Sequence, residues 1–330
     1  MYLLPAGMRD WLPQELALKQ DVESKIRAVL KARAYPELAT PFLERAALFR
    51  DAAGAEMSGA LHLSDPLGAD LVLRTDMTTP IARAVSARFD EDAFPLRLSY
   101  IAPVFQYESQ RRIIRESTQA GVELIGTRSL EADAESLHMA IETLDALGLR
   151  DACFDINDTR IVDDVLNGFS LGGPEILKCK ALVAERNMVA LEEFGKTANV
   201  DPVKYAAFLR LIMLHGKGEA LDTARELCDG RGALAAIDQL SELLRRSEEL
   251  GYGERVSVDF ALLRRLHYYT GFVFEAYVRD LGFWLCGGGR YDTLLPQFGK
   301  QTSGVGWMLV VERVLLALER RNAREGAAAQ

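Results

Sequence analysis

An acidic residue and several arginines mark the stretch VFQYESQRRIIRESTQAGVELIG. Two apolar, strand-like runs flank this charged set, which is Glu108, Arg111, Arg112 and Arg115. Arginine pairs with phosphate through parallel N–H donors, so these side chains are candidates for a polyanion clamp. A solvated basic hairpin tip is at least as good an interpretation of the same residues.

Three further polar residues lie in patterns that suggest a small-ligand pocket. Asp76 follows an expected strand and precedes an expected helix. A carboxylate there can bind an ammonium group or cap the helix, and the stretch alone favours the cap. Gln119 and Glu123 are four residues apart in an expected strand, so their side chains share one face. Two polar groups on an apolar strand suggest a site, with cross-strand pairing as the alternative.

Two later stretches combine rings, cations and glycines. LLRRLHYYTGFVFEAY contains Arg264, His267, Tyr268 and Tyr269, and its tyrosines could supply rings and hydroxyls to a small planar ligand. His267 taken alone is more typical of a structural role. CGGGRYDTLL offers three glycines that permit close backbone approach to a ligand, although such a loop is often only a turn.

Hydrophobic periodicity predicts the elements that position these residues. Helices are expected at 13–35, 78–87, 130–147 and 311–321. Strands are expected at 38–42, 70–74, 96–105, 118–125, 152–156, 256–260, 272–277 and 283–286, with a further apolar run at 304–311. The arginine-rich segment joins 96–105 to 118–125 as a long antiparallel hairpin.

From about Asp158 to Gly251 the sequence becomes rich in Leu, Ala, Glu, Lys and Arg with helical spacing. This predicts a helical insertion, 158–251, inside a discontinuous core of 1–157 and 252–322. Residues 323–330 are expected to be a frayed tail. Strands, then helices, then strands indicate an α+β fold around a mostly antiparallel sheet.

The composition is that of a globular protein. The net charge of −9 over 330 residues lowers the expectation of nucleic acid as the main partner. We find no run of 18 apolar residues and no signal-peptide pattern, so no membrane segment is expected. The four cysteines lack CxxC spacing, which favours reduced thiols, a cytoplasmic location and no metal site.

Taken in order, these segments resemble class II aminoacyl-tRNA synthetases, most closely histidyl-tRNA synthetase. LPAGMRDWLP resembles that family's N-terminal entry, and the hairpin at Phe105–Glu108 resembles its second class motif. LRRLHYY and GGGRYD resemble its two histidine-specific signatures, and GVGWMLVVER resembles its third class motif. Five ordered matches over nearly the whole chain imply the class II antiparallel sheet flanked by helices.

The chain departs from that family in the ATP site. Gln106 stands where the synthetases have an arginine, and loss of such a fixed cation is expected to lower the rate about 10²–10³-fold. In the signature RGLDYY, Arg265 replaces glycine and His267 replaces aspartate. The ATP-site positions that keep their charge are Glu108, Arg115 and Arg313. No anticodon-binding domain is expected after the third motif, which argues against tRNA as a partner.

This combination resembles the family of ATP phosphoribosyltransferase regulatory subunits, synthetase paralogues of histidine biosynthesis. The resemblance implies a non-catalytic chain that activates the short catalytic phosphoribosyltransferase and lets L-histidine inhibit it. It implies no cofactor, and a homodimer within a larger hetero-oligomer.

The resemblance also implies a retained histidine pocket. Asp76 and Gln119 would hold the α-ammonium group, and Glu123 and Tyr269 would bond the imidazole nitrogens. Arg264 would face the carboxylate. The residues that would help to wall the pocket are Tyr268 and Tyr291. One alternative is an amino-acid-adenylating enzyme, and another is a scaffold that senses nothing.

Overall fold

The structure is a computed structural model, and it describes residues 3–53, 59–108, 113–198, 200–263, 269–279 and 281–328. Several residues singled out in the sequence lie outside these ranges, namely Arg111, Arg112, Arg264, Arg265, His267 and Tyr268.

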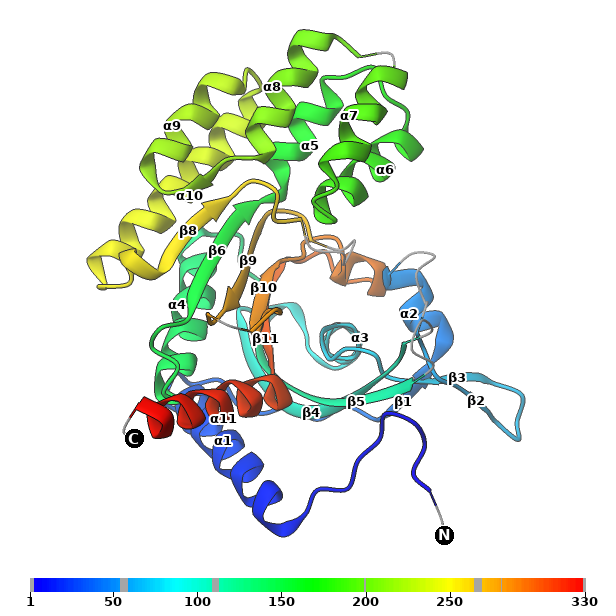
Figure 1. Ribbon diagram of the computed structural model, residues 1–330. Helices are drawn as coiled ribbons and strands as arrows, with labels where there is room; N and C mark the ends of the chain where they lie inside the picture. Colours follow the sequence, from blue (N-terminus) through cyan, green and yellow to red (C-terminus); the bar gives the residue numbers. More distant parts are fainter. Residues whose placement is uncertain are drawn as a thin grey trace.

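An eight-stranded sheet forms the centre of the described part (Figure 1). Its order is β4-β5-β11-β10-β9-β6-β8-β7, and the neighbouring pairs are antiparallel except for β6 with β8. This confirms the expected α+β class with a mostly antiparallel sheet. The strands are β4 Leu96–Glu108, β5 Ile113–Ile125, β6 Cys153–Asp158, β7 His215–Gly216, β8 Val256–Asp259, β9 Phe272–Tyr277, β10 Cys286–Arg290 and β11 Gly304–Val310.

In a smaller sheet of order β1-β3-β2, β3 confirms the strand expected at 70–74, whereas β1 and β2 were not predicted. Its strands are β1 Leu43–Arg45, β2 His62–Ser64 and β3 Asp70–Leu73. Short 3-10 turns lie at Glu91–Ala93, Gly253–Arg255 and Leu295–Phe298.

The helices fall into two groups. α1, α4 and α11 pack against one another beside the large sheet, and α3 lies across its other face (Figure 1). With α2, these are α1 Pro13–Ala32, α2 Ala46–Ala53, α3 Thr78–Arg88, α4 Leu130–Ala146 and α11 Val311–Ala328. None of the helices in the described ranges has the length and apolar character needed to cross a membrane.

The second group stands together beyond the β8 end of the sheet (Figure 1). We call it the insertion. It consists of α5 Thr159–Asn167, α6 Gly173–Ala184, α7 Met188–Thr197, α8 Pro202–Ile212, α9 Gly218–Leu227 and α10 Arg231–Glu249. Much of it packs around a hydrophobic cluster of its own, which includes Phe169, Tyr205 and Phe208.

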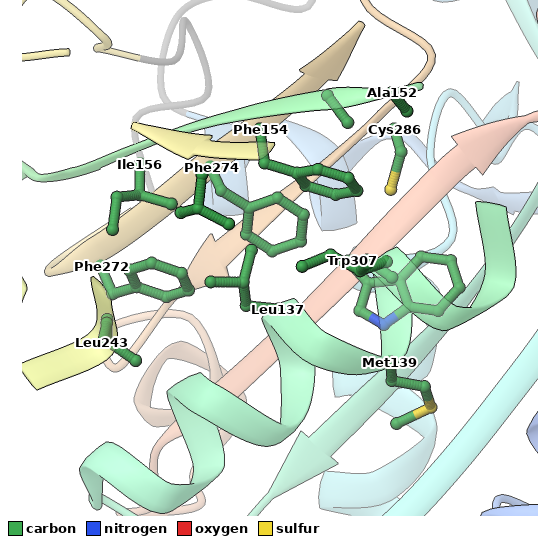
Figure 2. Close-up of a cluster of buried hydrophobic side chains, with 14 of the residues drawn as sticks. Leu137, Met139, Ala152, Phe154, Ile156, Leu243, Phe272, Phe274, Cys286 and Trp307 are labelled. Atoms are coloured by element: carbon green, nitrogen blue, oxygen red, sulfur yellow. The ribbon is translucent and has the colours of Figure 1, made fainter. Parts of the chain in front are cut away.

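The pleat of β5 separates an apolar face from a polar one. Ala120, Val122 and Leu124 point into the main hydrophobic core beneath the helices. Gln119 and Glu123 therefore point to the opposite face, because successive strand residues alternate sides. Figure 2 shows the centre of that core, where Phe272, Phe274 and Phe154 lie with Trp307 over helix α4. The rings of Phe272 and Phe274 stack with centroids 5.7 Å apart.

The glycines of GGGRYD were expected in a loop after a strand at 283–286, and that prediction is wrong. Cys286–Arg290 is itself a strand, paired with β9 on one side and β11 on the other. The reason is close packing: a Cβ on Gly288 would lie 2.1 Å from the carbonyl oxygen of Gly306 and 2.6 Å from Cα of Trp307. Only glycine permits this approach of two strands.

Two other elements have bounds that differ from those expected from the sequence. Residues 38–42 were expected as a strand, but the regular pairing begins at Leu43. The carbonyl oxygens of Thr40 and Pro41 instead accept bonds from the buried guanidinium of Arg74, at 2.7 and 3.4 Å. At the other end, α11 continues to Ala328, so 323–328 are helical rather than frayed.

Candidate functional site

A cavity of about 450 Å³ opens on the polar face of the sheet. Its floor is formed by β5, β9, β10 and β11, and the β3–α3 turn closes one side. The residues predicted from sequence that line it are Asp76, Gln106, Gln119, Glu123, Tyr269 and Tyr291. Chain segments from both halves of the sequence thus meet at one place.

Asp76 makes the capping contact that its position suggested and also lies at the cavity, so its binding of an ammonium group stays a prediction. Its carboxylate accepts a bond from the backbone N–H of Thr79 at 2.8 Å, which satisfies a donor in the first turn of α3. Its side chain also lines the cavity. Burial raises the pKa of Asp76, and its bonds with Thr79 oppose that shift. An ammonium group beside it would favour the charged form.

Gln119 and Glu123 lie on the same face of β5, as the four-residue spacing predicted. They are 5% and 1% exposed. Opposite Glu123 on β11 stands Gly306, where a Cβ would lie 2.2 Å from the Glu123 Oε2 atom. Glycine at this position therefore makes the space that the carboxyl group occupies.

Two hydroxyl groups hold the Glu123 carboxyl. Thr78 donates to Oε1 at 2.8 Å, and Tyr291 donates to Oε2. Burial is the main cause that raises the pKa of Glu123 to about 8, and these two bonds act against it. At neutral pH this group can therefore be a donor or an acceptor, depending on what faces it.

Two of the tyrosines expected in the pocket, Tyr269 and Tyr291, form part of the cavity wall. Tyr291 is 2% exposed, and its ring packs where a Cβ on Gly304 would lie only 2.2 Å away. Tyr269 is half-buried and packs beside the apolar cluster of α3. Tyr268 and Arg264, which were expected beside them, lie outside the described residues.

The residues of the expected ATP site do not all lie at the cavity. Gln106 lines the cavity and donates to the carbonyl oxygen of Thr75 at 3.2 Å. Glu108 and Arg115 do not line the cavity. They form an ion pair of 2.8 Å near the hairpin tip. Arg313 donates to the Trp284 carbonyl at 2.7 Å and lies 4.1 Å above that indole ring.

Sequence reasoning missed several polar residues of this cavity, among them Thr78, Glu275 and Arg186. Thr78 was expected only as the first residue of the helix at 78–87, yet its hydroxyl donates to Glu123. Glu275 comes from β9, whose alternation could have placed it on the same polar face of the sheet as Glu123. Arg186 comes from the insertion, and no local pattern marks it as a site residue.

The cavity combines carboxyl, amide and hydroxyl groups that can bind a small polar ligand. Over the described ranges, no three His, Cys, Asp or Glu side chains are grouped as metal ligands. What the site offers is a carboxylate for an ammonium group, and buried polar groups that can bond a small ring. Such groups reject ligands that leave them unpaired.

The fold and this site define a histidyl-tRNA synthetase-like class II core. The family model described as Histidyl-tRNA synthetase matches residues 7–314. A crystal structure of an ATP phosphoribosyltransferase regulatory subunit/histidyl-tRNA synthetase from Bacillus halodurans C superimposes with a TM-score of 0.90 at 31% identity, covering 96% of this chain and 83% of that one. A histidine–tRNA ligase subunit from Alicyclobacillus acidocaldarius gives a TM-score of 0.85 at 27% identity, covering 98% of both chains.

Curated relatives narrow the assignment. The ATP phosphoribosyltransferase regulatory subunit of Caldanaerobacter subterraneus is 35% identical over 98% of this chain and 85% of the relative. That of Moorella thermoacetica is 39% identical over 95% of this chain and 81% of the relative. The chain belongs to the family of ATP phosphoribosyltransferase regulatory subunits.

Proposed function

We propose that this chain is a non-catalytic, histidine-sensing subunit. It binds the short catalytic ATP phosphoribosyltransferase, which joins ATP and phosphoribosyl pyrophosphate at the first step of histidine biosynthesis. The chain activates that partner and transmits inhibition by L-histidine. We further propose that it works in the cytoplasm, as a homodimer within a larger hetero-oligomer, and without tRNA.

The observation that carries this proposal is the composition of the cavity. All of the following line it: Asp76 and Gln119, which would hold the α-ammonium group, Glu123 and Tyr269, which would bond the imidazole nitrogens, and Tyr291, which would help to wall the pocket. The residue of β4 that lines the same cavity is Gln106, which has no charge to stabilise an ATP phosphate. A pocket that binds an amino acid but lacks this cation is suited to sensing without turnover.

Histidine would act by binding one arrangement of the complex better than another. A ligand shifts a conformational equilibrium only by its differential affinity for the two states. Arg264 and Tyr268 belong to this proposed pocket as well, at the carboxylate and the wall.

The test is a mixing assay with the short catalytic subunit from the same organism. Formation of phosphoribosyl-ATP is followed with and without this chain, and L-histidine is then titrated. Activation on mixing, with a changed response to histidine, is the expected result. No complex and no change in rate would refute the proposal.

A second candidate is an enzyme that adenylates histidine. The Glu108–Arg115 ion pair and the position of Arg313 over Trp284 favour it, because these charged groups persist. Histidine-dependent exchange of pyrophosphate into ATP at the rate of a synthetase would establish this candidate instead.

A further inference from the structure

One wall of the cavity belongs to the insertion. α6 ends at Ala184 and α7 begins at Met188, and the connection between them places Ala184 and Arg186 at the cavity. Ala261 and Leu263, which follow β8, also line it. Both are buried in the insertion's hydrophobic cluster, so this wall is packed on the insertion rather than on the sheet.

The facing wall belongs to a different cluster. Tyr291 packs with Met77 and Ile81 of the α3 region, and Tyr269 packs beside them. Glu123 lies on the sheet and is bonded by Tyr291. A ligand that spans the cavity can therefore contact both hydrophobic clusters and influence how they are held together.

Arg186 is fixed in place by an unusual backbone and a buried acid. Its φ of 53° lies in the left-handed region, which is uncommon for a residue other than glycine. Its guanidinium donates to Asp259 at the end of β8. Asp259 is 2% exposed and also accepts the N–H of Ala261 at 3.0 Å. This acid thus ties the insertion loop to the segment that lines the cavity.

The Arg186 side chain remains 61% exposed although it is ion-paired. A guanidinium has five N–H donors in a fork that fits a carboxylate. Asp259 therefore holds the Arg186 side chain in place but does not occupy all five of its N–H donors.

Acidic side chains outnumber basic ones around the cavity. Three carboxyl groups line it, those of Asp76, Glu123 and Glu275. Among the described lining residues, Arg186 is the one with a cationic side chain. A free amino acid brings both an ammonium group and a carboxylate, and the carboxylate needs a cation on a wall otherwise rich in acids.

We infer that Arg186 is a second cation for the carboxylate of the amino-acid ligand, in addition to the Arg264 of the proposed function, and that the ligand thereby joins the insertion to the sheet. This inference rests on the proposed function, because that function makes histidine the ligand. Arg186 is then a specificity-determining residue, and it selects amino acids with a free carboxylate.

The test compares two ligands on the full chain by titration calorimetry. L-histidine carries the carboxylate, and L-histidinol has a hydroxymethyl group in its place. Arg186→Met is expected to weaken histidine binding on the order of 10–100-fold, since a charged hydrogen-bonded pair is lost. Histidinol affinity should change less than about threefold. Arg210→Met removes an exposed arginine of α8 away from the cavity, and should alter neither affinity.

Loss of Arg186 also leaves Asp259 buried without its ion-pair partner, so a second variant guards against misfolding. Arg186→Met/Asp259→Asn removes that buried charge, and asparagine can still accept the Ala261 N–H. The double variant should fold and show the same selective loss of histidine binding.

Two results would overturn the inference while leaving the proposed function intact. One is wild-type affinity for histidine in both Arg186 variants. The other is an equal loss for histidine and histidinol, which would mean that Arg186 only supports the wall. If the wild-type chain binds neither ligand and the catalytic partner does not respond to it, the proposed function fails, and the inference fails with it.

Discussion

At the scale of single residues, Asp76 caps helix α3, and we propose that it also binds the ammonium group of the ligand. Its carboxylate bonds the Thr79 N–H at 2.8 Å and also faces the cavity. The two roles have different chemical needs. An N-cap needs only an acceptor oxygen, whereas an ammonium group needs negative charge.

Substitutions at Asp76 therefore separate the roles. Asp76→Asn keeps an acceptor for Thr79, and we expect its free energy of unfolding to stay within about 0.5 kcal/mol of wild type. Histidine affinity should fall about 10–100-fold in calorimetry, because the charge is gone. Asp76→Ala should lose about 1 kcal/mol of stability as well. Full histidine affinity in Asp76→Asn would leave Asp76 with its capping role alone.

Glu123 predicts a pH dependence of stability. Its pKa is about 8 in the folded protein, against an ordinary value of 4.5. Between these values the folded protein holds a proton that the unfolded chain has released. The associated stability is thus complete below about pH 4.5 and is lost as the pH rises through 8.

Relative to Glu123→Gln, which does not titrate, the wild type should lose on the order of 1 kcal/mol of unfolding free energy per pH unit between pH 5 and 8. Urea unfolding at several pH values measures this difference. Glu116→Gln removes an exposed carboxylate of the hairpin and should run parallel to wild type. If the unfolding free energies of Glu123→Gln and of the wild type changed in parallel with pH, Glu123 would be ionised in the folded protein throughout this pH range.

At the scale of secondary-structure elements, the sequence predicted an element well where its apolar residues repeat with the spacing of either a helix or a strand. The hairpin of β4 and β5 was predicted because its apolar runs and its arginine-rich connection stand out. Helix α4 was predicted from its apolar spacing, and it begins at the Ser129 cap and ends before Gly148, which has a φ of 84°. Alternation along β5 also placed Gln119 and Glu123 on a common face.

What the sequence could not supply depends on contacts between distant segments. The glycines of β10 gave a loop signal, because nothing local shows that Gly288 packs against Trp307. Arg186 gave no signal, since its relation to Asp259 and to the cavity exists only once the insertion has packed on the sheet. Resemblance alone brought Tyr291 into the site, whereas the ring-rich stretch around Tyr269 had already suggested a place for a small planar ligand.

The close approach of β10 and β11 predicts a large effect of one methyl group. Gly288→Ala would place a Cβ 2.1 Å from the Gly306 carbonyl oxygen, so a central strand pair must separate. We expect a loss of about 3 kcal/mol or more in the free energy of unfolding. Gly282→Ala is the matched control, because its Cβ meets nothing within 4 Å, and it should change stability by less than about 0.5 kcal/mol. Equal effects in chemical denaturation would contradict this account of the glycine strand.

At the scale of the whole molecule, the cavity lies where two hydrophobic clusters meet. A ligand that contacts both should make their motions depend on each other. Histidine at about 100 times its dissociation constant should stabilise the chain by about 2.7 kcal/mol.

Hydrogen exchange shows where that stabilisation acts. With histidine bound, we expect slower exchange both in the sheet around Glu123 and in the insertion at 184–188. In Arg186→Met, at a histidine concentration that gives equal occupancy, the protection at 184–188 should be lost and that in the sheet retained. Protection confined to the sheet in the wild type would show that the ligand does not engage the insertion.

The strand order also has a consequence for how the chain is made. β5 pairs with β4 on one side, but its other neighbour is β11, which is translated after the whole insertion. At about 5–20 residues per second, the ribosome needs roughly ten seconds or longer to deliver that partner. During this interval one edge of β5 stays open, and the face bearing Ala120, Val122 and Leu124 lacks α11 as a cover. The growing chain thus passes through a stage in which an unprotected strand edge can attract chaperones or neighbouring nascent chains.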